Sequence, residues 1–286
     1  MLRPLDPGEF VQGTIFTCGL SASYPNVPVL GLLITARCDT AQDKTEVYNY
    51  IPLIPVEAWI EKEGLELVAK RAMASELGSI KKALTEAGMA HSIINFVDYD
   101  TILTELEAGS SKQEKAIAKR FSQATVAFRR ASAILDKSDR TLGEALTFLD
   151  ANDGLYKSLV RELMTNTLAE FHYLERSDIG EETRGYVALM REIRFISAAL
   201  GKRIAVGLDA EEFNSLRETL FPSLNHIRFS AKHDFAMPLS CVSSPFIELI
   251  MQRFANLFSR IGVADISKDR IAEAHSWVKV MREGTK

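Results

Sequence analysis

Cys38 and Asp39 are the first residues of this chain whose side chains could do chemistry. They follow the apolar run of residues 29–34, which reads as a strand buried on both faces, and polar side chains after such a strand often line a site. A thiol nucleophile needs a general base, most often histidine, and a lowered pKa. Arg37 could stabilise a thiolate, but no histidine is near in sequence. The pattern therefore favours a buried structural cysteine, with Asp39 capping the turn, over a catalytic one.

Arg228 and His233 form a second candidate pair. Their R-x4-H spacing resembles the short motif of HEPN ribonucleases, where a general base and a phosphate-binding arginine act together on the 2′-hydroxyl of RNA. That motif belongs on a helix, whereas here β-type residues precede it and Pro238 follows. The competing interpretation is a strand followed by a polar loop.

Residues 111–135 are the clearest helical pattern in the chain, with apolar residues along one face. The other faces carry Lys112, Lys115, Lys119, Arg120, Arg129 and Arg130, with few acidic residues among them. Such a face is either solvated, docks an acidic protein, or follows a phosphate backbone. We take it as the candidate binding surface, with both a protein and a nucleic acid open as partners.

Motifs for metal, nucleotide and hydrolase chemistry are missing from the sequence. The five histidines are scattered and form no metal-ligand spacing, and no P-loop, GxGxxG or GxSxG motif occurs. This argues against an NTPase, a Rossmann enzyme and an α/β-hydrolase. We expect no metal and no cofactor.

The composition is that of an ordinary globular protein. Of 286 residues, 47% are hydrophobic and 25% charged, and the net charge of −4 gives no global attraction to nucleic acid or anionic lipid. The start of the chain lacks the apolar core of a signal peptide, and no run is long enough to span a bilayer. Three cysteines without a C-x-x-C spacing indicate reduced thiols. We expect a cytoplasmic protein that does not bind membranes.

Elements of both kinds must position these residues. Strands are expected over residues 10–18, 27–36, 46–54, 169–174, the first half of 186–196, and 226–229. The stretch 186–196 can also be read as a helix. Helices are expected over residues 56–74, 75–87, about 100–106, 111–135, 142–149, 155–164, 245–261 and 268–282.

The helix over residues 245–261 has its own expected details. Ser243 or Ser244 should cap its first turn. Its buried face is expected to comprise Phe246, Leu249, Ile250, Phe254, Leu257 and Ile261.

The expected fold class is α+β: a small SH3-like β-barrel or sheet, interrupted by a helical insertion, with C-terminal helices packed on it. Residues 1–57 and 169–286 should form one discontinuous domain, because neither flank alone could bury a good sheet. Residues 58–168 should form a helical lobe.

Two family resemblances add to this interpretation. The segments beginning at Gly13, Val27 and Tyr50 resemble the strand order of MazF/PemK-type SH3-like barrels. The arginine that those toxins place after the first strand has no match within residues 16–22, which argues against ribonuclease activity. The pattern TxxCD from Thr35, with SPxxE from Ser244 and QRF from Gln252, is similar to uncharacterised bacterial proteins of phage-defence and mobile-element loci.

The sequence thus predicts an accessory or recognition component of an anti-phage assembly. It would bind a protein partner, with nucleic acid as a further ligand, and would not be an enzyme. The alternatives are an RNA-cleaving effector and a DNA-binding accessory protein.

Overall fold

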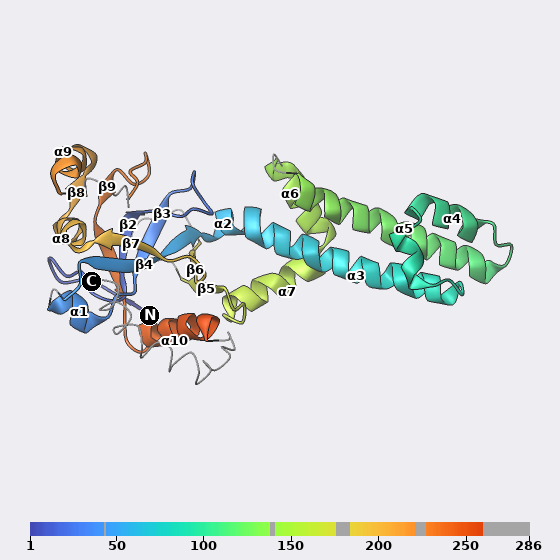
Figure 1. The fold of residues 1–286 in the computed structure, drawn as a ribbon, viewed down its shortest axis with the longest axis horizontal. Helices are drawn as coiled ribbons and strands as arrows, with labels where there is room; N and C mark the ends of the chain where they lie inside the picture. Colours follow the sequence, from blue (N-terminus) through green and yellow to red (C-terminus); the bar gives the residue numbers. More distant parts are fainter. Residues whose placement is uncertain (43, 138–140, 176–183, 221–226, 260–286) are drawn as a thin grey trace, which may run out of the picture.

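The computed structural model describes residues 1–42, 44–137, 141–175, 184–220 and 227–259. It has a curled sheet at one end, and a long helical arm projects from that sheet (Figure 1). The strands are β1 (Leu2–Arg3), β2 (Thr14–Gly19), β3 (Val29–Leu33), β4 (Val47–Pro55), β5 (Phe171–Leu174), β6 (Tyr186–Leu189), β7 (Arg194–Ser197), β8 (Leu208–Asp209), β9 (Phe235–Ala236) and β10 (Pro238–Val242).

The main sheet is antiparallel, in the order β1-β10-β2-β3-β4-β6-β5, and β7 also pairs with β4. β4 shows how strands distant in sequence come together, since Val47–Tyr50 pairs with β7 while Leu53–Pro55 pairs with β6. At the other side, β10 lies between β1 and β2. Strands from both sides of the helical segment therefore belong to one curled sheet. The mixed α/β character expected from the sequence is confirmed.

The apolar run in β3 is buried on both faces, as predicted. Leu30 and Leu32 pack into one hydrophobic cluster of the sheet and Leu33 packs into another. Gly31 between them is required by its neighbour, because a Cβ atom there would lie 2.3 Å from the ring of Phe16 on β2.

The arm leaves the sheet directly from the end of β4. α2 (Val56–Trp59), the π-helical turn η1 (Ile60–Gly64) and α3 (Leu65–Glu86) follow one another without a break. The sequence predicted two helices that meet at residue 75. They are one helix because Ile80, Ala83 and Leu84 continue the buried face that starts at Leu65.

The rest of the arm folds back along α3. After η2 (His91–Asn95), the chain forms α4 (Tyr99–Glu107), α5 (Lys112–Asp136), α6 (Leu142–Ala151) and α7 (Asp153–Met164). α5 and α6 each begin with a capping box, built on Ser111 and Thr141. The far part of the arm has its own core between α3, α4 and α5, whereas the core at its base includes strand residues such as Ile54 and Val187. The arm and the sheet therefore share packing at the base of the arm.

Four more helices cover the sheet: α1 (Arg37–Ala41), α8 (Ala198–Val206), α9 (Ala210–Leu220) and α10 (Phe246–Phe258). The sequence did not predict α1, α8 or α9. The stretch 186–196 contains β6, a turn and the start of β7, so the helical alternative was wrong. Residues 227–229 form no strand, while residue 226 and the expected helix 268–282 lie outside the described residues.

α10 packs on the sheet with part of the predicted face: Ile250 is buried as expected, and Phe254 and Leu257 pack against the same cluster, while Ile261 lies outside the described residues. Ile247 and Ile250 are fully buried, while Phe246 and Leu249 are exposed. The helix starts one residue later than expected, and no side chain caps its first turn. Ser243 instead donates its hydroxyl to the carbonyl of Met1, which holds the N-terminal strand.

Candidate functional site

Cys38 lies on the solvent side of α1. The thiol is exposed, and it donates a hydrogen bond to the Asp39 carboxylate, 3.5 Å from the sulfur. The expectation of a buried structural cysteine was wrong, because the chain turns into α1 soon after Ile34 and buries Thr40 instead. No hydrogen bond joins Cys38 to a histidine in the described part of the chain. Within the described residues the thiol therefore has the Asp39 carboxylate as its neighbour and no imidazole to activate it.

The three cysteines should therefore differ in reactivity. Burial raises the pKa of Cys18 to about 12 and also raises the pKa of Cys241, so these two thiols should stay protonated and shielded. Iodoacetamide at pH 8 should modify Cys38 at least about tenfold faster than the others, since rates follow exposed thiolate. Peptide mass spectrometry of the native protein measures this. Equal labelling of all three would contradict the described packing, and Cys38→Ser should leave the melting temperature unchanged.

The helical context required by the R-x4-H motif is not found at Arg228 and His233. Both residues lie in an irregular segment before β9. Arg228 is exposed and donates its backbone N–H to the carbonyl of Cys18, at 2.8 Å. His233 is buried, and burial lowers the pKa of its imidazole, with a smaller contribution from Lys232. An exposed arginine and a buried, neutral histidine do not form a shared phosphate site.

The basic residues of α5 divide into two groups. Arg120 and Arg129 lie on opposite sides of the helix and hold the arm together: Arg120 pairs with Glu86 of α3, and Arg129 pairs with Asp100 of α4, at 2.9 Å. The Arg129 guanidinium also lies 5.9 Å from the ring centre of Tyr99. These two charges are already engaged within the arm.

The other four basic residues face solvent. Helical periodicity places them opposite the buried Phe121, and none of them makes an ion pair within the described residues. We call this set the α5 stripe: Lys112, Lys115, Lys119 and Arg130. It extends for about 27 Å, from the helical rise per residue. Only part of the predicted basic surface is therefore available to a partner.

Apolar side chains are also exposed on the arm. Phe96, between η2 and α4, is 86% exposed, and Val126 lies in the exposed part of α5. Glu107 shares a shallow hollow with Lys115 and Lys119. The outer surface of the arm thus mixes apolar groups, cations and carboxylates, as protein–protein interfaces do.

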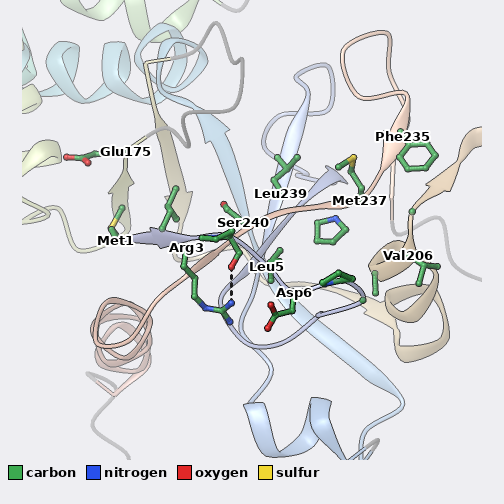
Figure 2. Close-up of a pocket in the computed structure, with 17 residues that line it drawn as sticks. Met1, Arg3, Leu5, Asp6, Glu175, Val206, Phe235, Met237, Leu239 and Ser240 are labelled. Carbon is green, nitrogen blue, oxygen red and sulfur yellow. Dashed lines mark hydrogen bonds between the residues drawn. The ribbon is translucent and has the colours of Figure 1, made fainter.

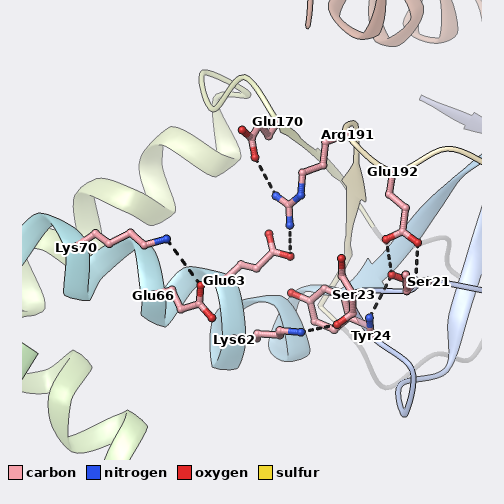
Figure 3. A network of polar contacts seen from close by, with 11 residues as sticks. Ser21, Ser23, Tyr24, Lys62, Glu63, Glu66, Lys70, Glu170, Arg191 and Glu192 are labelled. Atoms are coloured by element: carbon pink, nitrogen blue, oxygen red, sulfur yellow. Dashed lines mark hydrogen bonds and ion pairs between the residues drawn. The ribbon is translucent and has the colours of Figure 1, made fainter. Parts of the chain in front are cut away.

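A polar network fixes the arm to the sheet (Figure 3). Arg191, in the turn after β6, lies between two carboxylates: it pairs with Glu63 of η1 at 2.6 Å and with Glu170 at 2.9 Å. Its guanidinium also lies 5.1 Å from the ring centre of Phe171. Burial, together with the nearby Glu63, raises the pKa of Tyr24 in the same region. The π-helical turn is therefore the place where the arm is anchored by charge.

Sequence reasoning missed this network because its members are far apart in the chain. Glu63 and Arg191 are 128 residues apart in the sequence, and neither belongs to a recognisable motif. A five-residue π-helical turn also has no clear sequence signature. The one sequence signal that could have indicated this ion pair is Glu63, a charged residue at a position on the apolar face of the helix.

The residues behind the second family resemblance have structural roles in this fold. Arg253 of α10 donates hydrogen bonds to the backbone carbonyls of Asn166, Leu168 and Phe171. These bonds hold α10 against the segment that connects the last helix of the arm to β5. Nearby, burial lowers the pKa of His172 to about 4, so this histidine is neutral. The Thr35 hydroxyl accepts the backbone N–H of Asn49 at 2.7 Å. These motifs support the core of the fold.

The described residues contain neither a metal-binding cluster nor a membrane-spanning helix. No group of three or more histidine, cysteine or acidic side chains there could hold a metal ion. No helix in that part is long and apolar enough to cross a membrane.

Comparison with known proteins gave no relative: no family model, no curated protein and no solved structure matches this chain.

Proposed function

We propose that this protein is a docking component that binds an acidic surface of a protein partner through its helical arm. The observation that supports this proposal most strongly is the α5 stripe. Its four cations face solvent, while Arg120 and Arg129 are paired inside the arm. Cations of this kind steer an oppositely charged partner and fix its register. Phe96 supplies an exposed aromatic anchor of the kind that dominates interface energies.

A protein partner is favoured over nucleic acid. Carboxylates such as Glu107 lie beside the stripe and weaken the positive field that a phosphate backbone would need. The aromatic residues of α5, Phe121 and Phe128, pack into the core of the arm, so the helix offers no fully exposed ring on which bases could stack.

The curled sheet would act as an SH3-like recognition module beside the arm. We place the assembly in bacterial anti-phage defence, on the resemblance of the TxxCD, SPxxE and QRF segments to proteins of such loci. A non-enzymatic role fits the exposed Cys38, which has no hydrogen bond to a histidine within the described residues, and the neutral, buried His233.

Charge reversal on the stripe should abolish docking without unfolding the arm. We expect Lys119→Glu/Arg130→Glu to weaken the complex at least about tenfold, or about 1.4 kcal/mol, because attraction becomes repulsion. The complex is obtained by co-expression with neighbouring genes, and affinity is measured by biolayer interferometry. The matched control is Lys44→Glu/Lys232→Glu, which changes the charge equally on the exposed sheet end.

The control should bind like the native protein, and both variants should keep the native melting temperature. Equal binding by the stripe variant would contradict the proposal. Stripe-dependent binding of a 20-base-pair DNA or a single-stranded RNA would replace the protein partner with nucleic acid.

A further inference from the structure

A pocket of about 720 Å³ lies beside the outer edge of β10. Its walls come from the N-terminal segment, from the end of α8 and from the β9–β10 segment. Its volume is in the range of ligand sites. Neither the α5 stripe nor the arm contributes to it.

One wall of this pocket is an open sheet edge. β1 pairs with β10 only through Leu2↔Val242 and Arg3↔Cys241. Pro4 follows at once and lacks the N–H that would continue the ladder, so the N-terminal segment leaves the sheet there. Residues 238–240 consequently have no neighbouring strand on that side within the described part of the chain, although Pro238 among them also has no N–H to donate. An edge of this kind is a template for an added strand.

The side chains around the edge suit an apolar segment. Val206, Phe235 and Met237 are among the exposed large hydrophobic residues of the molecule, and all three line this pocket. In Figure 2 they lie on one side of the pocket, and Glu175 lies on the other. Leu239 lies between them on β10.

The polar groups of the pocket add a charge preference. Arg3 is already held by both carboxylate oxygens of Glu9, while Asp6 and Glu175 make no ion pair within the described residues. The α-amino group of Met1 also lines the pocket and offsets one of these two carboxylates, so the pocket keeps a small excess of negative charge. Ser240, only 5% exposed, also lines it, and its hydroxyl has no hydrogen-bond partner among the described residues.

We propose that this pocket binds an extended segment of a partner protein, which adds a strand to β10 beside residues 238–240. Alternate apolar side chains of that segment enter the pocket by Val206 and Met237. A lysine or arginine of the segment meets Asp6 or Glu175, which lie on different sides of the pocket in Figure 2. This site is independent of the α5 stripe, so either proposal can fail without the other.

The test is a selection of random twelve-residue peptides displayed on phage against the full-length protein. Enriched peptides should alternate apolar and polar residues and contain a lysine or arginine. Their affinity for the native protein is then measured by fluorescence polarisation with synthetic copies. Asp6→Lys/Glu175→Lys should weaken binding at least tenfold, and so should Val206→Glu.

The matched control is Glu105→Lys/Glu107→Lys, which reverses two exposed carboxylates on the arm and should change affinity by less than twofold. Melting temperatures of all variants show whether each is folded, and the two pocket variants alter different exposed side chains, so one suffices if the other fails. The proposal is overturned if no peptide is enriched, or if enriched peptides bind the pocket variants like the native protein.

Discussion

A Trp59→Ala variant is expected to lose about 3–5 kcal/mol of unfolding free energy, the usual cost of removing a buried tryptophan. Trp59 is fully buried at the start of the arm, and its ring packs edge-on against Phe171 of β5, with 5.1 Å between ring centres. Gly64 lies against the same ring, where a Cβ atom would be 3.2 Å away. The side chain thus fills the space between arm and sheet, and alanine would leave a cavity.

Urea unfolding followed by circular dichroism measures this loss. Phe96→Ala is the matched control, because it also truncates an aromatic residue of the arm but at an 86% exposed position. It should change stability by no more than about 0.5 kcal/mol. If the two variants are equally stable, the arm does not depend on its junction with the sheet.

The second large effect concerns two adjacent residues of α10. Ile250→Ala should cost about 2–5 kcal/mol, whereas Leu249→Ala should cost about 0.5 kcal/mol or less. Ile250 is fully buried with Leu30, Leu32 and Ile247, while Leu249 is 49% exposed. The same urea measurement compares them. A larger loss for Leu249→Ala than for Ile250→Ala would contradict the described orientation of α10.

The difference at α10 shows what periodicity can and cannot predict. The apolar pattern of residues 245–261 predicted the helix but only part of its buried face, because apolar residues occur around much of its circumference. Periodicity also does not show contacts distant in sequence, such as the Ser243 hydroxyl on the carbonyl of Met1 and Arg253 on the loop before β5.

Elements with a regular apolar pattern were predicted well, because the pattern itself indicates which residues are buried. The run of β3 and the apolar face of α5 each contain enough repeats to determine which residues are buried. Short elements were missed, since β1, β8 and β9 have two residues each and are held by partners elsewhere in the chain.

The candidate site was predicted only in part. The sequence identified the six basic residues of α5, but the pairing of Arg120 with Glu86 and of Arg129 with Asp100 depends on how the arm folds back. The exposure of Cys38 depends on a turn of α1 that has no strong signature. The Glu63–Arg191 pair joins residues that no local pattern connects.

The salt dependence of the complex tests the docking proposal most directly. Dissociation constants of the co-expressed partner would be measured from 50 to 300 mM NaCl for the native protein and for Lys119→Glu/Arg130→Glu. The docking account predicts that native affinity falls at least about tenfold over this range, because exposed charge pairs are screened. It also predicts weaker and less salt-dependent binding by the variant. Identical salt curves for the two proteins would contradict docking through the α5 stripe.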